Sequence, residues 1–315
     1  MAFSVFGIRK ENVYHEGSSF ILLFDVAQTL AVSLGSARLG SKEIAMTEAR
    51  MQETPKYAPG TFCWVELSTT DGEAAKKFYS RLFGWTPDDR PMGPGMVYTM
   101  LNLGGKSTGA LYQMEPEKTA QGIPPHWMSY VSVDSADETA AKAQELGATL
   151  LAGPFDVMTF GRMAVIQDPT GAVFSLWQPR DTPGAGVVNA PNSFCWNELM
   201  TTDTTKDGDF YSGVFGWGKD TQNFGPLEYT MFSNGERAAG GMLKITPEMG
   251  NIPPNWVVYF AVDDCDAKTQ KATELGGSVM KPPADIPNIG RFSIVNDPQG
   301  AMFALIKLEN PEAAA

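Results

Sequence analysis

The sequence predicts an α+β protein built from two tandem copies of one domain. Two observations predict it: a long internal repeat, and an order of strand-like and helix-like runs that occurs twice within each copy. Residues 62–85 match residues 194–217 at 14 of 24 positions, an offset of 132. Two later blocks, 123–137 and 161–177, recur at an offset of 129. Loss of one short loop explains the difference, so the repeat covers whole domains.

The repeat divides the chain into five parts. The first domain is expected over 59–180 and the second over 191–308. The segment 181–190 (DTPGAGVVNA) is rich in Pro, Gly and Ala, which is typical of a linker. Residues 1–58 form an N-terminal extension, and 309–315 form a tail.

The first copy opens with a strand and a helix. Residues 62–68 alternate between two faces, and Asp71 is placed to cap a helix whose apolar residues recur at helical spacing. Gly84 ends that helix. Two further strands are expected over 97–103 and 108–114.

The second half of the copy repeats this order. A strand is expected over 128–133, and a helix over about 135–146 with Gly147 just after its end. Strands follow near residue 149 and over 163–167 and 172–177. A DPTG or DPQG tetrapeptide, which suits a type I turn, joins the last two strands of each copy. Each domain is therefore predicted to contain two βαβββ modules.

The N-terminal extension contains an apolar run, Phe20–Leu34. The run is 15 residues long and is interrupted by Asp25 and Gln28, whereas a membrane-spanning helix needs about 20 apolar residues. Three interpretations remain: translation begins at Met46 or Met51, the run forms a peripheral helix, or it is a secretion signal. We expect no membrane partner.

Composition excludes other classes of function. The 315 residues carry a formal net charge of −12, which argues against nucleic acid as a partner. The three cysteines are far apart and lack a CxxC spacing, so neither disulfides nor a zinc site is indicated. We expect a cytoplasmic protein, and the sequence leaves open whether it is a monomer or a homodimer.

These motifs resemble the vicinal oxygen chelate superfamily, which includes glyoxalases, bleomycin resistance proteins and extradiol dioxygenases. The resemblance rests on the TTD helix start, the FYSRLFGW and FYSGVFGW helix ends, the DPxG turns and the paired modules, and it covers about residues 60–308. It implies that paired modules curl into cupped mixed sheets that hold a small molecule, often with a divalent metal.

The family's metal positions carry unsuitable residues in this chain. The resemblance places them on the first and last strands of the modules, and six can be assigned: Trp64, Trp196, Met128, Val257, Ser175 and Ala304. None of these side chains is an imidazole, carboxylate or thiolate donor for a divalent cation. A fourth position in each domain, on the strand near 110–114 or 242–246, stays unassigned, and one ligand would not make a site. We therefore expect no metal and no cofactor.

Strand alternation predicts which side chains line each cup. In the first domain these are Trp64, Glu66, Tyr130, Arg162 and Ser175. In the second domain the equivalent lining residues are expected to be Trp196, Glu198, Tyr259 and Arg291.

These residues support two interpretations. Glu66 and Glu198 are candidate general bases or hydrogen-bond acceptors, with Arg162 and Arg291 holding an anionic group of the ligand. Alternatively, each Glu–Arg pair is an internal brace of the sheet. His126, next to a Pro-Pro turn, is interpreted as a turn residue.

The preferred hypothesis is a tandem-domain protein that binds a small organic molecule without the family's metal site. The first alternative is an enzyme, either a metal-dependent lyase or dioxygenase or a metal-independent acid–base catalyst that uses Glu66 and Glu198. The second is a scaffold in which one domain has lost its pocket and only stabilises the other.

Overall fold

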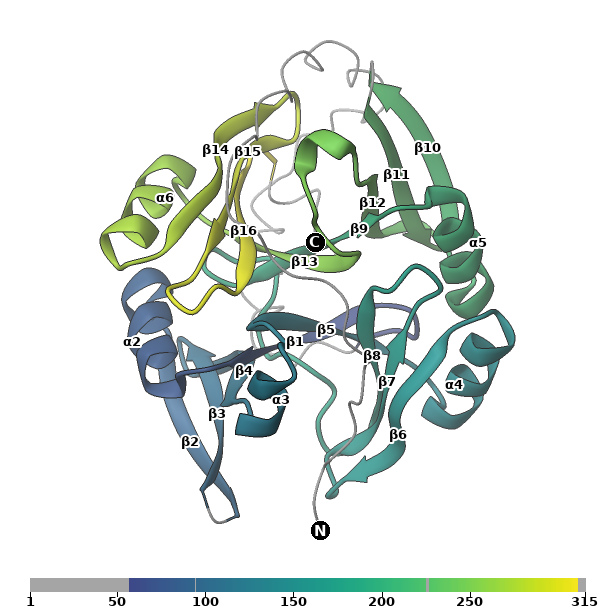
Figure 1. The fold of residues 1–315 in the computed structure, drawn as a ribbon, viewed down its shortest axis with the longest axis horizontal. Coiled ribbons are helices and arrows are strands. Elements are labelled where there is room, and N and C mark those ends of the chain that lie inside the picture. The colour runs from purple at the N-terminus through teal and green to yellow at the C-terminus, as the bar shows by residue number, and fades with distance from the viewer. Residues whose placement is uncertain (1–56, 94, 225–226, 311–315) are drawn as a thin grey trace, which may run out of the picture.

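The computed structural model describes residues 57–93, 95–224 and 227–310, which form two eight-stranded mixed sheets (Figure 1). The α+β class and the two tandem cupped sheets are thus confirmed. The expectations for residues 1–56 and for most of the tail lie outside the described residues.

The first sheet is built from residues before the linker. Its strands are β1 (Phe62–Thr69), β2 (Thr86–Gly93), β3 (Met96–Leu103), β4 (Lys106–Gln113), β5 (His126–Ser132), β6 (Thr149–Val157), β7 (Gly161–Gln167) and β8 (Val173–Pro179). Its helices are α2 (Gly72–Phe83), α3 (Pro116–Ala120) and α4 (Ala136–Glu145).

The second sheet repeats the first. Its strands are β9 (Phe194–Thr201), β10 (Gly218–Phe224), β11 (Leu227–Asn234), β12 (Arg237–Lys244), β13 (Asn255–Ala261), β14 (Ser278–Ile286), β15 (Gly290–Asn296) and β16 (Met302–Leu308). Its helical segments are α5 (Thr204–Phe215), the 3₁₀ turn η1 (Pro247–Met249) and α6 (Cys265–Glu274).

Both sheets join their two modules at the centre. The strand order of the first is β2-β3-β4-β1-β5-β8-β7-β6, with β1 antiparallel to β5 and each parallel to its outer neighbour, β4 or β8. The second has the equivalent order. The first strands of the modules therefore form the floor of each cup.

Local sequence signals set the ends of the first helix of each domain. Asp71 accepts a hydrogen bond from the backbone N–H of Ala74 at 2.9 Å, and Asp203 caps α5 in the same way. Gly84 and Gly216 follow these helices with φ of 76° and 73°, the left-handed conformation that glycine adopts without strain.

The convex faces of the two sheets pack against each other, and α2, α4, α5 and α6 flank this central layer (Figure 1). In Figure 1, α2 of the first domain lies beside α6 of the second, and α4 lies beside α5. One buried cluster joins Leu67 and Phe83 of the first domain to Phe260 and Phe303 of the second. The two cups consequently open outward, in opposite directions.

A pair of reciprocal hydrogen bonds crosses this central layer. The Tyr79 hydroxyl on α2 donates to Asp297 Oδ2 in the DPQG turn of the second domain at 2.9 Å, and Trp127 Nε1 donates to the same hydroxyl at 3.1 Å. Tyr211 of α5 contacts Asp168 in the DPTG turn of the first domain at 2.9 Å. Each domain thus holds the other's turn through a buried tyrosine.

We expect Tyr79→Phe to lower the free energy of unfolding by about 2 kcal/mol, because it leaves Trp127 Nε1 and Asp297 Oδ2 without their buried partner. Urea unfolding followed by tryptophan fluorescence measures this loss. A change below about 0.5 kcal/mol would show that the contact between the domains does not depend on this hydroxyl.

None of the helices among the described residues has the length and apolar character that a membrane crossing requires.

Candidate functional site

The central strand β1 presents different side chains to its two faces. Val65 and Leu67 are fully buried in the cluster that includes α2. Trp64 and Glu66 point to the opposite, concave face, where they meet side chains from β3 and β5. The concave face of the first sheet, called the first cup below, therefore contains a carboxylate on its floor.

Two tyrosines hold the Glu66 carboxylate. The Tyr98 hydroxyl donates to Oε2 at 2.6 Å, and the Tyr130 hydroxyl donates to Oε1 at 3.2 Å. Trp64 Nε1 in turn donates to the Tyr98 hydroxyl at 3.2 Å. Burial raises the pKa of Glu66, while the tyrosine hydrogen bonds and the positive charge of Lys118 partly oppose that rise.

The concave face of the second sheet, called the second cup below, repeats this arrangement. Tyr259 donates to Glu198 Oε1 at 2.8 Å, and Tyr229 is a second hydrogen-bond partner of this carboxylate. Trp196 bonds to Tyr229 as Trp64 bonds to Tyr98. Burial likewise raises the pKa of Glu198.

Sequence reasoning missed Tyr98 and Tyr229, although a signal for them exists. Each lies in a YTM tripeptide, at 98–100 and 229–231, that recurs between the two copies. Aligning the third strand of the first domain with the third strand of the second domain would have found these tyrosines. Through these hydroxyls, β3 contributes to the site around Glu66 and β11 contributes to the site around Glu198.

Ser175 lies on the floor of the first cup. It pairs with Tyr130 across the parallel β5–β8 ladder, so the two side chains share a face. Its hydroxyl is fully buried and has no hydrogen-bond partner among the described residues. A buried polar atom of this kind requires a partner, which a bound ligand or water supplies.

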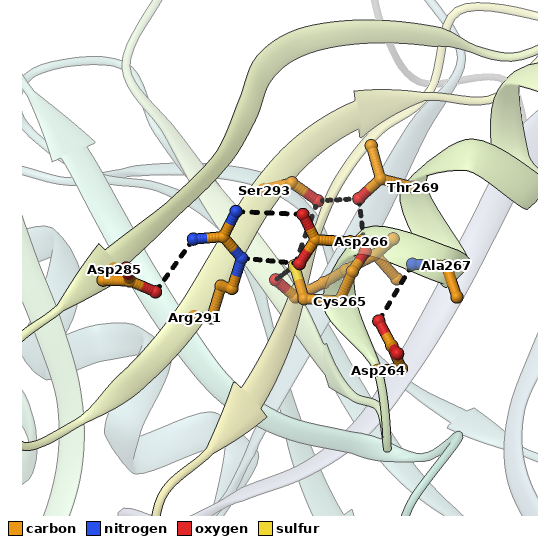
Figure 2. Close-up of polar contacts among 9 residues, drawn as sticks. Asp264, Cys265, Asp266, Ala267, Thr269, Asp285, Arg291 and Ser293 are labelled. Atoms are coloured by element: carbon orange, nitrogen blue, oxygen red, sulfur yellow. Dashed lines mark hydrogen bonds and ion pairs between the residues drawn. The ribbon is translucent and has the colours of Figure 1, made fainter.

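The prediction that Arg162 and Arg291 face the cups is wrong. Arg162 binds Asp137 on α4 with Nε and Nη2, at 2.6 and 2.9 Å, and binds Asp156 on β6 with Nη1 at 3.0 Å. Figure 2 shows the equivalent cluster around Arg291, which joins Asp266 of α6 to Asp285 of β14.

The error lies in the assumed orientation of β7 and β15. A cup-facing Arg162 requires Met163 and Val165 under the helix, because side chains alternate along a strand, but Ala164 and Ile166 are the residues buried there against α4. Both faces of these strands are covered by apolar groups, so hydrophobicity alone does not distinguish them. The Glu–Arg brace is therefore absent from both cups.

The cup residues do not fit a divalent metal. Each cup places one carboxylate on its floor, and this carboxylate accepts hydrogen bonds from tyrosine hydroxyls. Within the described residues there is no group of three or more His, Cys, Asp and Glu side chains that could hold a metal ion. Such an ion needs several of these donors at once.

Two surface hollows lie away from the cups. One, of about 530 Å³, runs between α2 and β2, and the other, of about 320 Å³, lies against the linker. Neither includes a residue of the Trp–Glu–Tyr clusters. These two hollows are therefore separate from the candidate sites around Glu66 and Glu198.

Comparisons with known proteins agree with this architecture. The Glyoxalase/Bleomycin resistance protein/Dioxygenase superfamily matches residues 61–176 and 193–305. The chain is 41% identical over 259 residues to "Putative glyoxylase CFP32" of Mycobacterium bovis, a match that spans 82% of this chain and 98% of that protein. It is 34% identical over 270 residues to "Anthracycline biosynthesis protein DnrV" of Streptomyces peucetius, again over 82% of this chain and 98% of that protein.

A solved structure shares the fold. The Mn(II)-bound glyoxalase from Novosphingobium aromaticivorans superposes with a TM-score of 0.58 at 15% identity, over 79% of this chain and 82% of that one. At this identity the similarity concerns the fold alone. The matched segments and the identity to full-length relatives establish the family. The chain belongs to the glyoxalase/bleomycin resistance protein/dioxygenase superfamily.

Proposed function

We propose that this protein binds a small, uncharged, partly aromatic organic molecule in a cup, without the metal site that other members of the superfamily use. The observation that supports this most directly is the Trp64–Tyr98–Glu66–Tyr130 cluster, in which a half-buried carboxylate accepts hydrogen bonds from two tyrosine hydroxyls. The name of the Streptomyces relative refers to anthracycline biosynthesis, which supports an aromatic ligand.

The chemistry of the cluster supports a neutral ligand. A desolvated carboxylate repels an anion. Arg162 does not compensate because it is engaged on the helix side, and the positive charge of Lys118 only partly opposes the effect of burial on Glu66. A ligand hydroxyl can donate to Glu66, while its rings pack on the indole of Trp64 and on Met128 and Met163, which pack around the first cup.

A second candidate function is acid–base catalysis by Glu66. Burial raises the pKa of Glu66, which brings a carboxyl group nearer to the range in which it accepts and returns protons at neutral pH. Glu66→Gln would then abolish turnover, and the bound substrate would remain in the cup.

The proposal is tested by titrating the protein with 2-naphthol in the presence of EDTA, with tryptophan fluorescence and calorimetry as readouts. We expect saturable binding that chelator does not alter, together with a rise in Tm. Conversion of methylglyoxal and glutathione is assayed in parallel, with and without Mn²⁺. Binding or turnover that requires added metal would overturn the proposal.

A further inference from the structure

We infer that the two cups are not equivalent: the first cup is the ligand-binding cup, and His126 is the residue in it that selects ligands bearing a hydroxyl group. This inference rests on the proposed function, and it adds the location of the ligand and the residue that recognises its polar end.

The cups share their Trp–Tyr–Glu–Tyr cluster and differ at the positions around it. The first cup carries polar side chains at five positions where the second carries smaller or less polar ones. The pairs are Ser68 and Met200, Tyr112 and Leu243, Lys118 and Met249, His126 and Asn255, and Ser175 and Ala304. Both copies therefore keep the Trp–Tyr–Glu–Tyr cluster, and they differ in the side chains around it.

The replacements make the second cup more apolar. Met200, Leu243, Met249 and Ala304 belong to one buried cluster with Tyr259, and each is at most 9% exposed. Met249, on the 3₁₀ turn η1, stands where the first domain has the partly exposed Lys118 on α3. The second cup thus packs as a small hydrophobic core of its own.

His126 belongs to the concave face of the first cup. In the antiparallel β1–β5 ladder it pairs with Ser68, while Met128 pairs with Glu66. Paired residues share a face, and residues two apart on a strand share it as well, so His126 lies about 7 Å along the cup floor from the carboxylate position. A ring-sized ligand spans this distance.

Comparison with Asn255 separates the structural role of His126 from its chemical one. His126 Nδ1 lies 2.8 Å from the carbonyl oxygen of Pro124, and Asn255 Nδ2 donates to the carbonyl oxygen of Pro253 at 2.7 Å. An asparagine therefore serves the turn as well as a histidine does. The two residues differ in the acceptor that remains: Asn255 keeps its amide oxygen Oδ1, whereas His126 carries Nε2 on the far edge of its ring, further from the backbone.

The state of the ring makes Nε2 an acceptor. A carbonyl oxygen only accepts, so the proton of the neutral ring lies on Nδ1 and leaves the Nε2 lone pair free. Burial lowers the pKa of His126, and the charge of Lys118 lowers it further against the opposing bond to Pro124. The first cup thus combines two acceptors, Glu66 and His126, with the unpartnered hydroxyl of Ser175.

The test compares two probes that differ in one hydrogen-bond donor, 2-naphthol and 2-methoxynaphthalene. We expect one 2-naphthol site per chain. His126→Asn, which keeps the turn contact, should weaken 2-naphthol binding about tenfold and leave 2-methoxynaphthalene binding unchanged. The matched variant Asn255→His in the second copy should change neither affinity.

The remaining outcomes separate the inference about His126 from the proposed function. Two equal sites per chain, unchanged 2-naphthol affinity in His126→Asn, or an equal loss for both probes would overturn the inference and leave the proposed function standing. Failure of the wild-type protein to bind either probe would overturn the proposed function and, with it, this inference. Circular dichroism of His126→Asn verifies that the variant is folded.

Discussion

Replacing Glu66 by glutamine should remove the charge selectivity of the first cup. We expect the wild-type protein to bind 2-naphthol and to exclude 2-naphthoate, which has the same rings but carries a negative charge. In Glu66→Gln, 2-naphthoate should bind at least tenfold more tightly than to wild type. Two like charges about 4 Å apart repel by about 4 kcal/mol in a partly desolvated site, and the substitution removes one of them.

Two variants provide controls for this experiment. Glu198→Gln removes the equivalent charge from the second cup and should leave both affinities unchanged, because we infer that the ligand binds in the first cup and apolar side chains surround the second carboxylate. Arg162→Ala should also leave them unchanged, since this guanidinium binds Asp137 and Asp156 on the helix side of the sheet. If Glu66→Gln still excluded 2-naphthoate, the carboxylate would not face the ligand. Calorimetry at pH 7.5 supplies both constants.

The second large effect is expected at the contact between the domains. Asp207 on α5 is fully buried, and it occupies the position that Ala75 has on α2. One carboxylate oxygen accepts hydrogen bonds from Thr170 and Thr201, and the other has no partner within the part of the chain that the structure describes. Burial and the nearby charge of Asp168 raise the pKa of Asp207 to about 6.

The raised pKa of Asp207 makes the protein less stable at higher pH. Because the folded-state pKa lies above the unfolded one, the folded state binds the proton more tightly, and stability falls as pH rises from about 4 to about 6. Above that window the ionised carboxylate costs on the order of 3 kcal/mol, since one pKa unit corresponds to about 1.4 kcal/mol. Asp207→Asn should therefore be more stable than wild type at pH 7.5, with the difference lost near pH 4.

Urea unfolding of wild type and Asp207→Asn at several pH values measures this difference directly. Asp168 also titrates from a raised pKa at this contact, and because its charge interacts with that of Asp207, the comparison reports the titration of the two carboxyl groups as a pair. Asp207→Ala, which introduces the residue of the first copy, should give the same trend. A stability difference that does not depend on pH would contradict the assignment.

Much of the fold follows from local sequence signals. The repeat, the Asp71 and Asp203 caps and the DPxG turns each act over a few residues, and the structure contains them where they were expected. The strand β2 was not predicted, because its segment is polar and contains Pro87 and Pro91. It forms at the edge of the sheet, where one side of the strand needs no hydrogen-bond partner.

The candidate site was only partly predictable. Alternation along β1 placed Trp64 and Glu66 on one face, since neighbouring side chains on a strand must point in opposite directions. It could not orient β7, whose two faces are both apolar, and this led to the wrong placement of Arg162. Nor could it connect Tyr98 to Glu66, because that contact depends on how the β3 strand curves over the cup.

The sequence by itself therefore determined the duplication, the modules and the presence of one carboxylate per domain, since these depend on short-range pattern and on the comparison of the two copies. Only the tertiary structure decided which groups surround each carboxylate and that the arginines bind aspartates on the helix side. Those contacts join residues far apart in the chain, and they arise from sheet curvature and from the packing of the domains.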